Sequence, residues 1–405
     1  MGKSGTRKLD GGSMKTLDYA INNRKGHKLE RHISPKADRM LFARFLSFSG
    51  LNQIQSVAQL SFLKHALQAA NVLQTRNYNA ILGLWPDENH WWQSARCLTA
   101  LVDLATIDTR FKSNVTAIVA HTYETNESKG GGNFTNDYYD DGGWWALAFI
   151  KASDMTKGTE HFMPEYLETA RFIFDNMTDA WGTKCGGGLP WRRSDPQPYL
   201  GAIQNELYLS VAVHLANRAF TAMEKSKYLN GAHKEWSWFK NSGMINSEGI
   251  INNGLNDRCE NDMGTTWTYN QGVILEALVE LDKATPGGCC LDDANRLAQA
   301  VLENRNLVNE RGILREPCET TGKPCDGDQR LFKGIFTDGL ATLHKRSPHP
   351  IYRQFLERNA EALWENDSRN GQISLRWTDP FDGTELDVGT QYSGLAALVA
   401  AASVQ

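Results

Sequence analysis

The stretch NELYLSVAVHLANRA, residues 205–219, predicts a helix that is apolar on nearly every side. Such a helix has no face suited to water, so other elements must surround it. Five more segments share its apolar, small-residue character: WWQSARCLTALVDLA (91–105), DDGGWWALAFIKAS (140–153), NQGVILEALVELDKA (270–284), FKGIFTDGLATLHK (332–345) and QYSGLAALVAAAS (391–403). Their starts recur every 50 to 65 residues or so, roughly the length of a helical hairpin with a long loop.

Amphipathic patterns with one charged face alternate with these buried segments. Examples are SVAQLSFLKHALQAANVL (56–73), PEYLETARFIFDNM (164–177), LDDANRLAQAVLENR (291–305) and HPIYRQFLERNAEALWE (349–365). Six buried helices alternating with six half-buried ones predict an all-α fold, an (α/α)6 barrel of six inner and six outer helices over residues 51–405. An open solenoid usually has shorter and more regular repeats. Strand-like segments are few, as at 312–316 and 373–377.

The composition is that of an ordinary globular protein, with 41% hydrophobic and 22% charged residues and a net charge of −4. This charge does not suggest a nucleic-acid partner. No apolar run approaches the roughly 20 residues of a membrane span. Residues 1–50 are basic near the start and lack a secretion-signal pattern, so we expect them to be an extension outside the fold. Nothing demands an oligomer, and we expect a monomer.

Seven cysteines are too few for a disulfide scaffold. The segment CETTGKPC, from Cys318 to Cys325, has a spacing that a disulfide could close. No CxxC or HxxxH spacing accompanies the cysteines, so we expect no metal site and no cofactor. The possible glycan acceptors in N-x-S/T triplets are Asn114, Asn126, Asn133, Asn176 and Asn366. Together these features favour a secreted protein.

The segment NDYYDDGGWWALAFI, residues 136–150, places two carboxylates, Asp140 and Asp141, at the start of a buried helix. Glycoside hydrolysis needs two carboxyl groups, one to protonate the leaving oxygen and one to attack or stabilise the anomeric carbon. Two such close charges cannot both ionise freely, so one pKa is raised and that group serves as the acid. Adjacent residues suit the short separation of about 5–5.5 Å that gives retention of configuration. The alternative is structural, because acids are common in the first turn of a helix.

The neighbours of this pair favour a site. Trp144 and Trp145 follow one turn later, so one of them can face the same opening, and flat aromatic faces suit pyranose rings. Gly142 and Gly143 are expected to leave room beside the carboxylates for a substrate. The loops before all six inner helices are rich in Gly, Asn, Asp, Trp or Tyr. In an (α/α)6 barrel these loops converge on one face, where they predict a polar, aromatic-lined cleft.

The segment YYDDGGWWALAFI resembles the signature of glycoside hydrolase family 76, the endo-α-1,6-mannanases and their fungal cell-wall relatives. The resemblance continues over residues 56–403 through CGGGLPWR (185–192), QNELYLSVAVHLA (204–216), WTYNQGVILEAL (267–278), CDGDQRLFKGIF (325–336) and TQYSGLAALVA (390–400). It implies an (α/α)6 barrel and metal-free, retaining hydrolysis of α-1,6-linked mannan, with Asp140 as nucleophile and Asp141 as general acid/base. The residues expected around the sugar are Trp144, Trp145, Trp191, Asn205, Tyr269, Asn270, Gln271, Asp328 and Gln329. Helix capping by Asn205 and Asn270, and a solvated Gln271, remain open alternatives.

Three functions fit these residues. The first is a secreted endo-1,6-α-mannosidase that acts on cell-wall or glycoprotein mannan. The second is a transglycosidase on the same scaffold, which moves mannan or a GPI-glycan onto wall polymer. The third is a non-catalytic mannan-binding protein, against which both carboxylates argue. The sequence shows neither a signal peptide nor a GPI-type tail, so we expect a secreted or cell-wall hydrolase rather than an anchored transferase.

Overall fold

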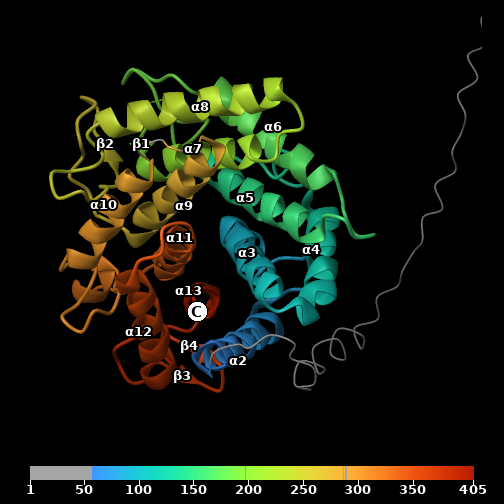
Figure 1. Cartoon of the computed structure of the whole chain (residues 1–405), viewed down its shortest axis with the longest axis vertical. Helices are drawn as coiled ribbons and strands as arrows, with labels where there is room; N and C mark the ends of the chain where they lie inside the picture. The colour runs from blue at the N-terminus through green and yellow to red at the C-terminus, as the bar shows by residue number, and fades with distance from the viewer. Residues whose placement is uncertain (1–56, 197, 286, 288–289) are drawn as a thin grey trace, which may run out of the picture. The chain divides into compact units, whose positions relative to one another are not determined.

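The computed structural model describes residues 57–405 except for 197, 286, 288 and 289 (Figure 1). The predicted extension, residues 1–50, lies outside the described residues, as do residues 51–56 of the predicted barrel domain.

Helices make up two concentric layers in this part of the chain. The inner helices are α3 (Trp91–Ile107), α5 (Tyr139–Thr156), α7 (Ala202–Ala216), α9 (Thr268–Ala284), α11 (Phe332–Arg346) and α13 (Val388–Ser403). The outer helices are α2 (Val57–Val72), α4 (Lys112–Asn126), α6 (Glu165–Asp179), α8 (Ala222–Asn241), α10 (Cys290–Glu303) and α12 (Pro350–Asn366). Each inner helix contacts the next, and α13 returns to α3, so the inner ring is closed (Figure 1). The predicted (α/α)6 barrel is confirmed.

Short elements decorate the loops. They are the helical turns η1 (Leu73–Asn77), η2 (Glu88–His90), η3 (Thr109–Phe111), η4 (Pro317–Thr320) and η5 (Gln329–Leu331), and the antiparallel strand pairs β1 (Leu200–Gly201) with β2 (Gly254–Leu255) and β3 (Ser368–Arg369) with β4 (Gln372–Ile373). Both strand predictions are largely wrong. Residues 312–316 form only an isolated bridge, between Leu314 and Val308, and of 373–377 only Ile373 belongs to a strand.

Small residues let the inner helices approach closely. A Cβ on Gly272 of α9 would lie 2.6 Å from the carbonyl oxygen of Ile335 in α11. A Cβ on Gly143 of α5 would lie 2.9 Å from Leu207 in α7, a distance that real Cβ contacts do not show. The prediction that Gly142 and Gly143 make room for a substrate is therefore wrong, because both are buried and lie against neighbouring helices.

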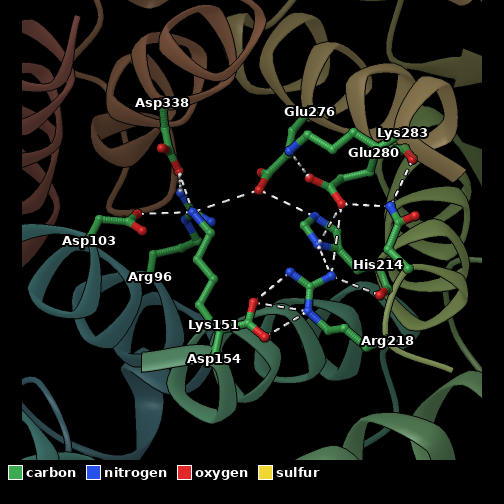
Figure 2. Close-up of polar contacts among 11 residues, drawn as sticks. Arg96, Asp103, Lys151, Asp154, His214, Arg218, Glu276, Glu280, Lys283 and Asp338 are labelled. Atoms are coloured by element: carbon green, nitrogen blue, oxygen red, sulfur yellow. Dashed lines mark hydrogen bonds and ion pairs between the residues drawn. The ribbon is translucent and has the colours of Figure 1, made fainter. Parts of the chain in front are cut away.

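Charged side chains gather inside the inner ring, mostly on the C-terminal halves of its helices (Figure 2). Lys151 of α5 has its Nζ 2.9 Å from Asp103 of α3, 3.5 Å from Asp338 of α11 and 3.7 Å from Glu276 of α9. Burial opposes ionisation of Glu276, but Lys151 and His214 nevertheless hold its pKa well below the usual range. Buried charges of this kind are tolerated only when they are paired.

The same network reaches the remaining inner helices. His214 of α7 lies 3.4 Å from Glu276 and 3.7 Å from Glu280, both on α9. Arg96 of α3 donates to the hydroxyl of Tyr392 in α13. Side-chain contacts thus link all six inner helices around the axis. A cavity of about 430 Å³ lies at the end of the ring where the inner helices have their C-termini. It is lined mainly by charged residues of α3, α5, α7, α9 and α11 or just beyond their ends.

Among the described residues, two disulfides join loop segments. The predicted bond between Cys318 and Cys325 is confirmed, and a second joins Cys185 to Cys259, 74 residues apart. Asn126 cannot accept a glycan in the folded protein, because its side chain is buried and its amide donates to two backbone carbonyls. No helix among the described residues is long and apolar enough to cross a membrane.

Candidate active site

The acidic pair lies in the first turn of α5, which begins at Tyr139. Asp140 and Asp141 are both partly exposed, although the helix behind them is buried from Gly142 onward as far as Ile150. The end of the ring that carries them is opposite the charged cavity: Asp154, which lines that cavity, is about 20 Å further along the helix at 1.5 Å per residue. The positive end of the helix dipole favours a negative charge at this position.

The Asp140 carboxylate is held by two donors. The indole Nε1 of Trp191 donates to Oδ2 at 2.8 Å, and the backbone N–H of Asp141 donates to Oδ1 at 3.0 Å. Burial of Asp140 raises its pKa to about 6, and these two hydrogen bonds limit the rise. Asp140 is therefore ionised at neutral pH, as a nucleophile must be.

The Asp141 carboxyl has a different environment. Its Oδ2 accepts a hydrogen bond of 2.6 Å from the Asn136 side-chain amide. Burial and then the neighbouring Asp140 charge raise the pKa of Asp141 well above its ordinary value. Asp141 therefore keeps its proton when Asp140 has lost its own, which is the division of roles that a retaining glycosidase needs.

A short antiparallel contact brings Trp191 to Asp140. The N–H of Tyr139 donates to the carbonyl of Trp191, and the N–H of Arg193 donates to the carbonyl of Asp137. The Asp137 carboxylate accepts from the Ser194 hydroxyl at 2.7 Å, which fixes the same two segments by side chains. The indole of Trp191, 37% exposed, packs at 5.0 Å from the ring of Tyr138.

Buried amides at the starts of the inner helices anchor the loops. Asn205 accepts from the N–H of Leu189 at 2.8 Å and donates to the carbonyl of Gly201 at 2.7 Å. Gln271 accepts from the N–H of Ile251 at 3.0 Å and donates to the carbonyl of the same residue at 2.8 Å. Both side chains are fully enclosed, so the prediction that they contact the sugar is wrong. Loop anchoring explains why amides stand there: the loop backbone groups would otherwise be buried without partners.

The adjacent tryptophans Trp144 and Trp145 of α5 are also buried. Trp145 lies in the core, stacked on Phe149 at 5.5 Å, and has no exposed surface. Trp144 is 2% exposed and lies beneath Trp92, with ring centroids 5.7 Å apart. Neither indole can reach a substrate directly, so these two predicted contacts are wrong. Trp144 instead supports the partly exposed Trp92 from below.

An aromatic surface continues from Trp92 across the ring. Phe332, which begins α11, lies 6.5 Å from Trp92 and stacks on Tyr269 at 3.9 Å. Trp267 packs edge-on to Phe332 at 5.7 Å and also contacts the Cys318–Cys325 disulfide region. Phe332 is buried, whereas the side chains of Trp92, Tyr269 and Trp267 remain partly exposed. Aromatic surface of this kind offers flat apolar faces for a ligand.

Polar groups border this surface. Burial raises the pKa of Tyr269, and the Asp140 charge acts in the same direction, so its phenol stays protonated as a donor. Asp328 is exposed and accepts from the Trp92 indole and from the Gln93 amide, each at 2.9 Å. Gln329 uses its side-chain oxygen to accept from the Asp326 N–H at 3.1 Å.

Two further polar side chains are buried close to these residues in the sequence or in space. The side-chain amide of Asn270 is enclosed and has no hydrogen-bond partner among the described residues. Glu206 of α7 is also enclosed, and neither carboxyl oxygen has a partner among those residues. Burial raises the pKa of Glu206 well above the usual range, so it carries no charge that would compete with Asp140. Among the described residues, no group of His, Cys, Asp and Glu side chains is arranged to hold a metal ion.

Trp92 and Asn136 also lie at this end of the ring, although neither was among the residues expected there from the sequence. Trp92 is the second residue of α3 and ends the segment LWPDENHWW, whose aromatic composition points to it, but its contact with Asp328 could not be read from the sequence. Asn136 precedes Asp141 by only five positions, but asparagine is common in loops, so the sequence alone does not single it out.

The chain is similar to known proteins over most of its length. The family model for glycosyl hydrolase family 76 matches residues 63–405. Mannan endo-1,6-alpha-mannosidase DFG5 of Candida albicans is 25% identical over 387 residues, which cover 89% of this chain and 83% of that protein.

Two solved structures share the fold. The first is an inactive variant of the alpha-1,6-mannanase GH76A of a Salegentibacter species, in which two consecutive aspartates are replaced by alanine and which is in complex with alpha-1,6-mannotetrose. It has a TM-score of 0.70 at 22% identity and covers 86% of this chain and 100% of its own. The second, Dfg5 from Chaetomium thermophilum in complex with glucosamine, has a TM-score of 0.71 at 19% identity and covers 87% and 92%.

Proposed function

The chain belongs to glycosyl hydrolase family 76, and on that premise we propose that it is a retaining endo-glycosidase that cleaves α-1,6-linked mannan. The observation that carries the proposal is the adjacent acidic pair in the first turn of α5, where Asp140 accepts from the Trp191 indole and Asp141 accepts from the Asn136 amide. Burial and the Asp140 charge raise the pKa of Asp141 well above its ordinary value, which suits the acid of the pair. A nucleophile and a general acid in one helical turn are the two groups that retaining hydrolysis requires.

The reaction follows from these protonation states. Asp140 attacks the anomeric carbon and forms a covalent glycosyl ester, while Asp141 gives its proton to the departing glycosidic oxygen. Water then enters, and Asp141, now ionised, takes its proton as the water oxygen attacks the same carbon. Asp140 leaves as a carboxylate, so both groups return to their first state. The N–H of Trp191 stabilises that carboxylate before the ester forms and again after the ester is hydrolysed.

The substrate class is supported by the relatives. DFG5 of Candida albicans bears the name of a mannan endo-1,6-alpha-mannosidase, and the inactive Salegentibacter enzyme holds alpha-1,6-mannotetrose with its two consecutive aspartates replaced. We propose that the sugar is contacted by residues at the same end of the ring, namely Trp191, Tyr269, Asp328 and Gln329. Asn270 is also predicted from the sequence to contact the sugar, but its side chain is as enclosed as that of Asn205 and has no exposed surface for a direct contact.

We further propose that the enzyme acts as a monomer outside the cell or in the cell wall. The two disulfides support this location, because such bonds persist in oxidising compartments. Secretion of active enzyme by the native host, measured in culture medium and in a wall fraction, tests it. Activity confined to the cytosol would contradict it.

The test of the activity is incubation with linear α-1,6-mannan, with the anomeric configuration of the first products followed by NMR. We expect internal cleavage, seen as a rapid fall in polymer length, and products that begin as the α-anomer. Products that begin as the β-anomer would overturn the retaining mechanism. Intact α-1,6-mannan alongside cleavage of another polymer would overturn the substrate.

Transglycosylation is the second candidate. It is supported by the fold shared with Dfg5 of Chaetomium thermophilum, whose complex contains glucosamine, and it requires the same covalent intermediate. Adding an excess of oligosaccharide acceptor separates the two reactions, because only transfer yields products longer than the acceptor. A mannan-binding protein without catalysis would retain its function after Asp140→Asn, whereas the enzyme would lose several orders of magnitude in kcat.

A further inference from the structure

A hydrogen-bonded bridge crosses one side of the ring at the catalytic end. Trp92 and Gln93 are the second and third residues of α3, whereas Asp328 precedes η5 and α11. In the ring, α13 lies between α3 and α11 (Figure 1). One oxygen of Asp328 accepts from both the Trp92 indole N–H and the Gln93 amide, at 2.9 Å each. An acceptor shared by two donors from one helix fixes the indole in a single orientation.

The surroundings of Trp92 show what that orientation serves. Below the ring lies Trp144, with an angle of 25° between the planes, and at its side lies Phe332. These two supports are 2% and 5% exposed, whereas Trp92 retains exposed surface. Trp92 is thus the outermost layer of an aromatic stack whose lower layers cannot reach a ligand.

The bridge is also close to the chemistry. The negative charge of Asp328 adds to the effect of burial in raising the pKa of both Asp140 and Asp141. It acts in the same direction on Tyr269, after the larger effects of burial and of Asp140. Trp144, on which Trp92 packs, follows Asp140 and Asp141 by about one turn of α5, so the stack and the acidic pair lie at the same end of the ring.

We propose that Asp328 is a positioning residue, which clamps the indole of Trp92 so that this ring forms a stacking surface for a mannose unit beside the cleaved bond. The inference rests on the proposed function and replaces the expectation that Asp328 acts on the sugar by direct contact alone. Binding therefore depends on Asp328 through Trp92.

Three variants separate these effects. Asp328→Leu removes acceptor and charge, Asp328→Asn keeps an oxygen acceptor but removes the charge, and Trp92→Phe keeps a ring but removes the N–H. We expect Asp328→Leu to raise KM for α-1,6-mannotetraose by up to about tenfold, with a smaller change in kcat, because aromatic contacts contribute on this scale. The double variant Trp92→Phe/Asp328→Leu is expected to show no further rise, since the two residues act as one unit.

Asp328→Asn should give a different result. Its amide oxygen can still accept from the indole, so KM stays within about twofold of wild type if the clamp persists. Loss of the charge lowers the pKa of Asp140 and of Asp141, so both limbs of the kcat/KM profile move to lower pH. Asp175→Asn is the matched control, because Asp175 is a half-exposed carboxylate on the outer helix α6, paired with Lys227.

The possible outcomes test the positioning role of Asp328 separately from the proposed cleavage of mannan. If wild-type enzyme cleaves mannan but Asp328→Leu leaves KM unchanged, the clamp is refuted and the proposed function stands. Equal rises in KM for Asp328→Leu and Asp328→Asn, additive with Trp92→Phe, would show direct contact with the sugar and overturn the positioning role. Failure of wild type to bind or cleave α-1,6-mannan would refute the proposed function itself. Thermal unfolding of each variant identifies any loss of fold.

Discussion

Replacing Trp191 by phenylalanine should move the pH dependence of the enzyme. The substitution keeps an aromatic ring against Tyr138 but removes the indole N–H that donates to Asp140 at 2.8 Å. That donor stabilises the ionised carboxylate, so its loss raises the pKa of Asp140 further. Because the proposed mechanism requires an ionised Asp140, we expect activity to be lost from the acidic side of the profile.

The size of the shift can be estimated from the contact. A hydrogen bond to a charged group contributes about 1.5–3 kcal/mol, which corresponds to about one to two pKa units. Trp191 is 37% exposed, so water partly replaces the lost donor and the lower end applies. The acidic limb of kcat/KM should therefore move from pH 6 or so to about 7. At pH 6 this lowers kcat/KM about fivefold through the ionised fraction alone.

The assay is kcat/KM for an α-1,6-mannooligosaccharide between pH 4 and 9, since this ratio reports groups of the free enzyme. The matched control is Trp181→Phe, because Trp181 donates through its indole to Glu235 at 2.6 Å, a contact that does not involve the catalytic pair. An acidic limb that stays in place in Trp191→Phe, or moves equally in both variants, would refute our account of how Asp140 is kept ionised.

Three more results are expected. The double variant Asp140→Asn/Asp141→Asn should be inactive yet unfold at a higher temperature than wild type at pH 7. Both carboxyls have raised pKa values in the folded protein, so the stability of wild type falls as the pH rises above the ordinary pKa of 3.8. The difference in unfolding temperature between variant and wild type should therefore vanish below that pH. Lys151→Met should lower the free energy of unfolding by about 3–5 kcal/mol, measured by urea titration, because it leaves buried carboxylates without their cation; a loss below 1 kcal/mol or so would show that water already screens the network. Replacing Cys185 and Cys259 by serine should cost about 4 kcal/mol by the same titration, given the 74-residue separation; an unchanged midpoint would show that the unfolded chain is not restrained by this bond.

The inner helices could be predicted because segments that are apolar on nearly every side must be surrounded by other elements. All six inner segments of the sequence correspond to helices, although α7 begins three residues before the predicted start at 205 and ends at Ala216. Outer helices are harder, since one face is wet. The polar helix α4 gives little periodic signal, whereas α8 carries a capping box between Thr221 and Glu224 that marks its start.

The site was predictable where chemistry depends on neighbours in the chain. Asp140 and Asp141 are adjacent, and Trp191 stands in a recognisable loop motif. The contact between Trp92 and Asp328 joins positions 236 residues apart, and no local pattern encodes it. The prediction that Asn205 and Gln271 contact the sugar was wrong for a physical reason. Both residues stand near helix starts, where polar side chains usually face water, but here loop segments fold over them.

The first turn of α5 has a consequence for how such enzymes diversify. Asp140 and Asp141 are consecutive residues of one regular helix, so the backbone largely fixes their relative placement, whichever loops surround them. The surrounding rim is contributed by segments that precede other inner helices, such as those with Trp191 and Asp328. Insertions in those segments can change which acceptor reaches the glycosyl ester while the reactive pair stays intact. A lineage can thus move between degrading a polymer and rebuilding one without inventing new catalytic groups.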